Sequence, residues 1–333
     1  MEYIWNGGIT DARLNLALEE YALRHFRGEE GEEGYLLFYV NDPAIIVGRN
    51  QNTVEEIDAG VVAERGIQVV RRMSGGGAVY HDRGNLNFSF ITPYAPERFN
   101  RYDLVTRPVV EVLRDLGVPA ELSGRNDIVV DGRKISGNAQ FAAEGRMFSH
   151  GTLLFDSKLD DVARALRPKP GKVESKGAKS VRSRVANIRE FLAEPMPLDE
   201  LRLRILARMF GDDVAASTRV LTPEEWRGVR ELAARKYGAW EWNYGESPAF
   251  TLRRAHRYAT GEVDVRLEVE RGRIGSVQIR GDFLGREPVS ELERRLVGVA
   301  HAPEALRETL SAARLEEYIS GVSADELVDL IAG

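Results

Sequence analysis

The chain has 333 residues and a mass of 37.2 kDa, which suits one large domain or two of medium size. Its composition, with 43% hydrophobic and 29% charged residues, is that of a globular protein and excludes a disordered or fibrous chain. The formal net charge of −6, from 46 basic and 52 acidic residues, argues against a nucleic-acid-binding protein. The chain has no cysteine, which excludes disulfides, thiolate metal sites and a cysteine nucleophile.

The N-terminal sequence MEYIWNGG has neither the basic segment nor the long apolar stretch of a secretory signal. The longest apolar runs, at 35–40 and 44–47, have the length of strands and are too short to span a bilayer. We therefore expect a cytoplasmic protein that does not enter a membrane.

Residues 10–26 have the spacing of an amphipathic helix, with Leu14, Leu18, Tyr21 and Ala22 on one face. Short β-rich runs separated by Gly, Asn and Asp follow, and a helix at 108–116 that ends at Gly117 interrupts them. These runs predict strands at 35–40, 44–48, 67–71, 78–81, 86–91, 127–130, 133–136 and 149–155. Strands in hairpins, mixed with helices, predict an α+β fold in which helices flank a mixed or antiparallel sheet.

The C-terminal part begins with a helix signal at 222–225, where an N-cap threonine, a proline and a capping-box glutamate stand in order. That helix should run to about Tyr237. The stretch GAWEWNYGESPAF at 238–250 has the glycine, aromatic and turn residues of a domain junction. Alternating apolar residues at 263–269 and 274–279 then predict strands, and a capping box at 323–326 predicts the last helix.

Three consecutive glycines, Gly75 to Gly77, lie between two predicted strands in RRMSGGGAVYHDRGNLNFSF at 71–90. Consecutive glycines cost backbone entropy, so this pattern indicates a backbone that closely approaches an anion such as phosphate. Arg71 and Arg72 could then supply charged donors. A glycine-rich hairpin with solvent-facing arginines explains the pattern equally well. The spacing is not that of a P-loop.

A hairpin is predicted at 126–140, because Asp131-Gly132 between apolar residues is the signal of a two-residue turn. The turn would pair Val130 with Arg133, Val129 with Lys134, Ile128 with Ile135 and Asp127 with Ser136. One face would then be apolar, and the other would hold Asp127 and Lys134. These two could form a site for an anion and its metal counterion, or a surface ion pair.

Two further segments have polar features. The predicted strand at 149–155 puts His150 and Thr152 on one face, where the histidine is either structural or a ligand contact. The stretch from Arg164 to Arg189 holds nine basic residues against the single acid Glu174. A long basic loop of this kind either closes over a polyphosphate, attracts an acidic partner, or is a solvated connector.

Together these segments resemble the motifs of bacterial two-domain lipoate–protein ligases, and they occur in the same order. The matching motifs are GRNQN at 48–52, RRMSGGGAVYHDRGN at 71–85, DGRKISGNAQ at 131–140, SHGTLL at 149–154 and KGAKSVRSRVANI at 176–188. The sequence WEWNYGESPAF at 240–250 also resembles the start of that family's C-terminal domain, so the resemblance covers nearly the whole chain.

The resemblance implies a catalytic domain over 1–244, similar to the biotin-ligase and class II synthetase core, and a small α+β accessory domain over 250–333. It also implies a reaction in two steps. Lipoate and Mg-ATP give lipoyl-AMP and pyrophosphate, and the lipoyl group then passes to a lysine of a partner. The implied partners are lipoyl domains of 2-oxoacid dehydrogenase E2 subunits and the glycine cleavage H protein, with no nucleic acid or membrane involved.

Motif matching implies the roles of individual residues. Lys134 matches the family's central lysine, which touches both the lipoate carboxyl group and the adenylate phosphate. The implied ATP contacts are Arg72, Gly77, Ala78, Val79, Tyr80, Lys134, Lys176, Ser180 and Arg182. The implied lipoate contacts are Arg71, Ser74, Gly75, Gly76, His81, Lys134, His150 and Gly151. Asp127, on the same face of the predicted hairpin, is the expected Mg²⁺ ligand.

Related enzymes offer alternatives. Octanoyltransferases of this fold use a cysteine nucleophile, which the chain lacks. A biotin ligase would carry a Gly-Arg-rich loop where this chain has RRMSGGG. A lipoyltransferase that uses preformed lipoyl-AMP stays open, and so does a non-catalytic lipoate or nucleotide binder, against which Lys134 argues.

Overall fold

The computed structural model describes residues 1–27, 34–124, 126–166, 184–215, 217–247, 250–281, 283, 285 and 287–333. These residues form two compact units, one of residues 1–49 and 66–239 and the other of residues 50–65 and 240–333. The expected domain boundaries, 1–244 and 250–333, stay a prediction. Residues 50–65 belong to the second unit, and the Thr53 amide in this segment donates a hydrogen bond to Ser247 Oγ at 3.2 Å. Within the described ranges no helix is both long and apolar enough to cross a membrane.

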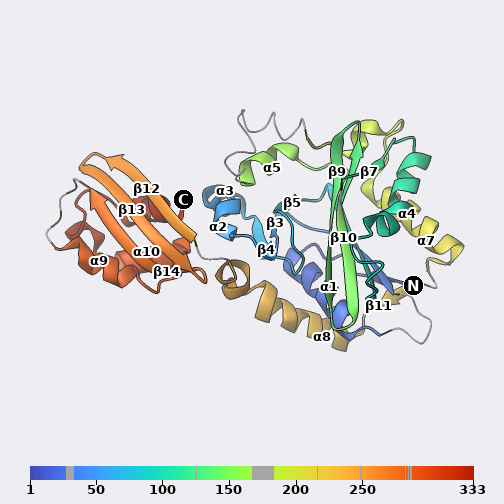
Figure 1. The fold of residues 1–333 in the computed structure, drawn as a ribbon, viewed down its shortest axis with the longest axis horizontal. Helices are drawn as coiled ribbons and strands as arrows, with labels where there is room; N and C mark the ends of the chain where they lie inside the picture. The colour runs from blue at the N-terminus through green and yellow to red at the C-terminus, as the bar shows by residue number, and fades with distance from the viewer. Residues whose placement is uncertain are drawn as a thin grey trace. The chain divides into compact units, whose positions relative to one another are not determined.

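A mixed sheet forms the centre of the first unit (Figure 1). Its strands, in spatial order, are β11 (Thr218–Val220), β1 (Glu2–Trp5), β2 (Tyr35–Val40), β6 (Asn85–Pro93), β10 (Arg146–Leu154), β9 (Arg133–Ala143), β8 (Asp127–Val130) and β7 (Glu121–Ser123). β1 pairs in parallel with both of its neighbours, whereas the pairs from β2 to β7 are antiparallel. The α+β class with a mixed sheet is therefore confirmed.

Helices cover both faces of this sheet. On one face, α4 (Tyr102–Asp115) and α7 (Leu198–Phe210) pack their apolar side chains against Leu36, Phe38 and Phe88 of the strands. On the other face lies α1 (Ala12–His25), which α8 (Pro223–Leu232) contacts. The other helices among the described residues of this unit are α5 (Leu159–Ala165) and the short turns at Ile188–Phe191, Gly211–Asp213 and Ala233–Tyr237.

A smaller sheet lies in the same unit and carries the glycine turn. Its order is β4 (Gln68–Arg71), β3 (Ala44–Val47) and β5 (Val79–His81), with β3 parallel to β4 and antiparallel to β5. The three glycines fall in the loop between β4 and β5. The predicted strands of this region are confirmed to within a residue at each end.

The predicted helix at 108–116 is wrong at its start, since α4 begins six residues earlier, at Tyr102, and contains Pro108 in its interior. Proline at the first helical position is the more common arrangement, which misplaced the boundary. The helix tolerates Pro108 there at the loss of one main-chain hydrogen bond. In the turn before the proline, the Thr106 hydroxyl donates a hydrogen bond to the Tyr102 carbonyl at 2.8 Å.

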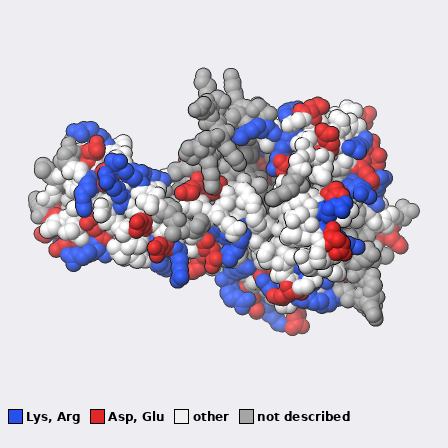
Figure 2. All heavy atoms as spheres, viewed as in Figure 1, with Lys and Arg blue, Asp and Glu red and all other residues white. Residues whose placement is uncertain are grey.

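The second unit contains an antiparallel sheet of β12 (Phe250–Tyr258), β13 (Gly261–Glu270) and β14 (Arg273–Gly281), as its alternation predicted. Its apolar face packs on α9 (Val289–Leu296), α10 (Pro303–Ala312) and α11 (Ala324–Ala332). The unit also holds α2 (Thr53–Glu56), α3 (Ala59–Arg65) and the turns at Glu241–Gly245 and Leu315–Glu317. Basic and acidic side chains intermingle on the face of each unit shown in Figure 2.

Candidate functional site

A cavity of about 320 Å³ lies in the first unit, between the large sheet and the smaller one. The large sheet contributes backbone and side chains from β2, β6, β9 and β10, and the smaller one contributes the glycine turn and β5. The lining residues are Leu16, Tyr39, Ile46, Arg72, Gly75, Gly76, Gly77, Ala78, Val79, His81, Asn87, Asn100, Tyr102, Asn126, Lys134, Gly137, Asn138, Ala139, Gln140, His150, Gly151 and Thr152. The cavity therefore joins the glycine turn, Lys134 and both histidines named from the sequence.

The hairpin that carries Lys134 has the predicted turn. Asp131 and Gly132 have φ angles of 50° and 72°, the left-handed conformation that a two-residue turn of this type requires. The two pairs next to the turn have the predicted register: Val130 with Arg133, and Val129 with Lys134.

The predicted pairs further from the turn are wrong, because β9 contains a bulge at Ile135. The observed partners are Ile128 with Ser136, and Asp127 with Gly137. Near its start, β9 also bonds to the segment 184–186: the Lys134 amide donates to the Arg184 carbonyl at 2.8 Å, and the Ala186 amide donates to the Lys134 carbonyl at 3.0 Å. The bulge places Gly137, which has no side chain, opposite Asp127.

The Lys134 ammonium lies over this glycine. Its Nζ atom is 2.8 Å from Oδ1 of Asp127, and both side chains are about one-third exposed, at 37% and 35%. A Cβ atom at position 137 would lie 2.7 Å from Nζ and 2.8 Å from Cε of Lys134. A side chain at position 137 would therefore displace the flexible end of Lys134 from this position.

Arg72 shapes the glycine turn from inside. Its guanidinium is buried and donates to the carbonyls of Gly75 at 2.7 Å, Gly77 at 2.8 Å and Ile46 at 3.0 Å. Burial lowers the pKa of Arg72 to about 10, so the group keeps its charge near pH 7. Gly76 has a φ of 95°, and a Cβ atom there would lie 2.9 Å from Arg72 Nη2. The turn is thus built around a buried cation.

Three residues expected at the ligand lie outside the cavity lining: Arg71, Tyr80 and Ser74, which is fully buried. The Arg71 side chain is fully buried and donates to the carbonyls of Gly48 at 2.9 Å and Arg49 at 3.0 Å. Tyr80 lies between Val79 and His81 on β5 and lines a different cavity, with Pro43 and Asp82, because alternate side chains of a strand point to opposite faces. Their contacts with lipoate and ATP stay predictions.

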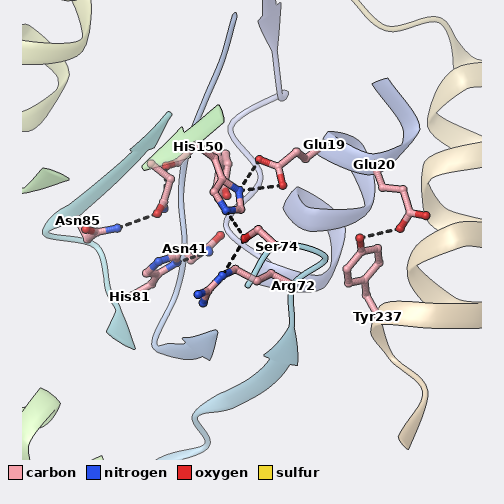
Figure 3. A network of polar contacts seen from close by, with 11 residues as sticks. Glu19, Glu20, Asn41, Arg72, Ser74, His81, Asn85, His150 and Tyr237 are labelled. Carbon is pink, nitrogen blue, oxygen red and sulfur yellow. Dashed lines mark hydrogen bonds and ion pairs between the residues drawn. The ribbon is translucent and has the colours of Figure 1, made fainter. Parts of the chain in front are cut away.

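A buried chain of hydrogen bonds joins α1 to the glycine turn (Figure 3). Arg72 Nε donates to Ser74 Oγ at 3.0 Å, and Ser74 Oγ is hydrogen-bonded to His150 Nε2, 2.7 Å away. His150 Nδ1 then donates to the two oxygens of Glu19 at 3.0 and 3.1 Å. Because both of its ring nitrogens bind protein atoms, His150 presents its ring to the cavity and holds the turn against the sheet.

His81 is the other histidine of the cavity and is only 3% exposed. Its Nδ1 atom lies 2.9 Å from Nδ2 of Asn41, an interaction drawn in Figure 3. Burial, with the charges of Arg72 and His150, lowers the pKa of His81 to about 3, so the imidazole is neutral at physiological pH.

Other expected site residues are not placed here. Lys176, Ser180 and Arg182 lie outside the described residues, as does most of the basic stretch. The described part of the chain contains no group of three or more His, Cys, Asp or Glu side chains that could hold a metal ion. Asp127, the expected Mg²⁺ ligand, forms an ion pair with Lys134. Its Oδ1 atom makes this contact, and its Oδ2 atom does not take part in it.

Sequence reasoning missed several polar residues of this site. Glu19 and Asn15 stand four residues apart on α1 and are both buried, at 2% and 1% exposure. Two polar residues at this spacing within an otherwise apolar helix are a signal for a buried network. Asn41, which follows β2, had no such signal, because its role depends on contact with His81 forty residues away.

Two family models match the chain. The lipoyl protein ligase A/B catalytic domain matches residues 11–210, and the bacterial lipoate protein ligase C-terminus matches residues 247–331. Among curated proteins, the lipoate–protein ligase LplJ of Bacillus subtilis is 51% identical over 99% of this chain and 100% of its own length. Lipoate–protein ligase 1 of Staphylococcus aureus is 47% identical, with both chains covered in full at 100%.

Three solved structures are also similar. A bipartite lipoate protein ligase of Thermoplasma acidophilum, studied with its E2 lipoyl domain, is 30% identical with a TM-score of 0.64 and covers 74% of this chain and 96% of its own. A putative ligase from that organism, with lipoic acid bound, is 30% identical with a TM-score of 0.59, over 71% and 95%. A lipoate–protein ligase A bound with ATP is 31% identical with a TM-score of 0.59, over 71% and 95%.

Proposed function

Since this chain belongs to the lipoate–protein ligase family, we propose that the cavity between its two sheets is where lipoate reacts with ATP. The protein is an ATP-dependent ligase with lipoate and ATP as its substrates. The product of the cavity is lipoyl-AMP, and the lipoyl group then passes to a lysine of a partner protein.

One observation carries the proposal: the Lys134 ammonium and the glycine turn line the same cavity. A lysine that pointed into bulk solvent, away from Gly75–Gly77, could not act on a ligand held by that turn. Gly137 leaves the space through which the lysine reaches the cavity, and Asp127 fixes its position at 2.8 Å.

In the first step a lipoate carboxylate oxygen attacks the α-phosphorus of ATP. A bond forms between that oxygen and the phosphorus, the bond to the bridging oxygen of the β-phosphate breaks, and pyrophosphate leaves. Carboxylate and triphosphate repel each other, so a cation between them lowers the barrier, most strongly where charge builds up in the transition state. We assign this role to Lys134, which is a compact point charge.

In the second step the neutral amine of the acceptor lysine attacks the acyl carbon of lipoyl-AMP. The amide bond forms, the bond from the acyl carbon to the phosphate oxygen breaks, and AMP leaves while the amine loses a proton. Lys134 again stabilises the negative charge, now on the departing phosphate.

The nucleotide would lie along the turn and β5. Gly77, Ala78 and Val79 line the cavity with exposed or half-buried backbone, and Arg72, which fixes the turn, adds positive potential from below. Mg²⁺ commonly binds one or two protein carboxylates together with substrate phosphates, so the half-buried carboxylate of Asp127 fits such a site. The metal ion would neutralise the leaving pyrophosphate.

The acceptors that we propose are the lipoyl domains of 2-oxoacid dehydrogenase E2 subunits and the glycine cleavage H protein. A relative studied with its E2 lipoyl domain supports the first of these. The cytoplasmic location stays a prediction. We also propose that Lys176, Ser180 and Arg182 contact the adenylate, as the motif match implies.

The function is tested with the purified protein, ATP, Mg²⁺, lipoate and an apo lipoyl domain. We expect lipoate-dependent release of pyrophosphate, followed by an increase in the mass of the lipoyl domain by one lipoyl group. Release of no pyrophosphate, combined with transfer from preformed lipoyl-AMP, would identify a lipoyltransferase instead. Neither step, with either lipoate or octanoate, would contradict the proposal.

A further inference from the structure

The Nε2 atom of His81 is buried, belongs to a side chain that lines the cavity, and has no hydrogen-bond partner among the described residues. A buried polar atom of this kind costs free energy unless a ligand or a water satisfies it. Whether Nε2 donates or accepts depends on which ring nitrogen carries the proton. That is decided by the group bound to Nδ1.

A chain of hydrogen-bonded asparagines determines which ring nitrogen of His81 carries the proton. The first of them, Asn6, is bonded to two main-chain groups. Asn6 Oδ1 accepts from the Gly8 amide at 3.1 Å, and Asn6 Nδ2 donates to the Ile9 carbonyl at 2.9 Å. Because main-chain groups have fixed roles, these two bonds fix which end of the Asn6 amide is oxygen and which is nitrogen.

Each following asparagine inherits its orientation from the one before. Asn6 Nδ2 donates to Asn15 Oδ1 at 3.0 Å, and Asn15 Nδ2 donates both to the Ile9 carbonyl at 3.0 Å and to Asn41 Oδ1 at 2.8 Å. Asn41 Nδ2 therefore faces His81 Nδ1 as a donor, 2.9 Å away. Nδ1 accepts, so the proton of the neutral ring is on Nε2, which is the buried donor of a side chain that lines the cavity.

The sheet register shows which end of the cavity this donor occupies. The Gly137 amide, next to the Lys134 ammonium, donates a hydrogen bond to Thr152 Oγ1 on the neighbouring strand. In the sheet, Thr152 is paired with Asn87, and Asn87 is paired with Tyr39. This row crosses β9, β10, β6 and β2, three strand spacings or about 14 Å. Asn41 follows β2 two residues after Tyr39, so His81 belongs to the end of the cavity away from Lys134.

An eight-carbon acid with its carboxylate at Lys134 reaches most of the way along this row, since an extended chain of seven C–C bonds spans about 9 Å. The far end of lipoate is a dithiolane ring, whose sulfurs are weak hydrogen-bond acceptors. The far end of octanoate is a methyl group, which accepts nothing. The two acids thus differ at the part of the ligand that lies toward His81.

We propose that the Nε2–H of His81, held as a donor by Asn6, Asn15 and Asn41, contacts the dithiolane sulfurs and makes the cavity select lipoate over octanoate. The inference rests on the proposed function, because it takes the carboxylate to lie at Lys134. A site built around a donor rejects an analogue that leaves that donor unpaired. Asn41 is a positioning residue here, since it acts on the ligand only through His81.

Asn41→Asp tests this at pH 8. The new carboxylate accepts from Nδ1–H, as acids beside histidine commonly do, so the ring proton moves from Nε2 to Nδ1. ¹⁵N NMR of the imidazoles, with His81→Phe to assign the signal, reports the position of the proton. Calorimetry gives the Kd of lipoate and of octanoate. Asn52→Asp is the matched control, because it is the same substitution at a buried asparagine that lies in the second unit and outside the cavity lining.

We expect the wild type to carry the proton on Nε2 and to bind lipoate more tightly. In Asn41→Asp the proton moves and the octanoate-to-lipoate ratio of Kd falls about three- to tenfold, the worth of one modest hydrogen bond. Asn52→Asp keeps the wild-type ratio. A wild-type ring protonated on Nδ1, or an unchanged ratio after the proton has moved, would overturn the inference.

A second variant covers failure of Asn41→Asp to fold. His81→Phe keeps a ring but removes the donor, and we expect the same fall in the ratio, with no fall contradicting the inference. The readouts also separate the two proposals. Selective binding of lipoate without pyrophosphate release would contradict the ligase mechanism alone, whereas pyrophosphate release with equal affinity for both acids would contradict the selectivity alone.

Discussion

A Cβ atom on Gly137 would lie 2.7 Å from the Nζ atom of Lys134, closer than non-bonded atoms approach each other. The lack of a side chain at position 137 therefore allows the lysine ammonium to lie where it does. The same register brings Asp127 opposite Gly137, so one bulge in β9 supplies both the space for the ammonium and the carboxylate that holds it.

Gly137→Ala should slow adenylate formation by about tenfold or more, because a displacement of about 1 Å at a reacting group costs this much or more. The residue does not have a positive φ, so alanine fits the backbone and the fold should survive. Lipoate-dependent pyrophosphate release measures the rate. Gly275→Ala on β14, whose added Cβ atom meets nothing closer than 3.8 Å, is the control, and equal rates in the two variants would refute the role of Gly137.

Glu19→Gln should destabilise the protein and weaken substrate binding. The substitution removes the charge from a hydrogen bond to His150 that is buried, and such bonds contribute about 2 kcal/mol. His150 then holds Ser74 and the glycine turn less firmly, so the KM for ATP should rise more than kcat falls. Denaturant unfolding and steady-state kinetics measure the two effects. The exposed Glu194→Gln should change neither, and an unaffected KM in Glu19→Gln would contradict the proposed contact chain.

The stability of the protein should fall as the pH is lowered from 7 to 5, in part because of His81. Its pKa is about 3 in the folded protein and 6.5 as a free side chain, so between these values the unfolded chain binds a proton that the folded one does not. Stability therefore rises with pH in this window, and at pH 5 His81 accounts for a loss of about 2 kcal/mol relative to pH 7.

Comparison of the wild type with His81→Phe isolates this effect, because the other histidines, including the buried His301, are present in both. Denaturant unfolding at pH 7 and pH 5 measures the difference. The variant should lose less stability than the wild type over this range. An equal loss would show that His81 titrates alike in the folded and unfolded states.

The sequence predicted the parts of this fold that depend on local signals. The turn at Asp131-Gly132, the capping boxes at Thr222 and Ser323 and the alternation of β13 are examples, since each needs only neighbouring residues. The bulge at Ile135 was not predictable in this way. It accompanies main-chain bonds from Lys134 to the segment 184–186, fifty residues further along the chain.

The site was predictable to a similar degree. The motif match brought Lys134, the glycine turn, His81 and His150 to one cavity, as the structure has them. Periodicity could not show that Arg71 binds the carbonyls of Gly48 and Arg49, nor that Asn41 orients His81. Such contacts depend on how separate strands and loops pack together, and on the direction of amide groups within a buried network.

The most direct test of the account compares Lys134→Ala with Lys158→Ala, which removes an exposed lysine that lies outside the cavity lining. The measurement is lipoate-dependent pyrophosphate release, with thermal unfolding as the check on folding. We predict that Lys134→Ala loses at least about 100-fold in rate while its unfolding temperature stays close to that of the wild type, and that Lys158→Ala keeps the wild-type rate. A folded Lys134→Ala protein that still forms the adenylate at the wild-type rate would contradict the account.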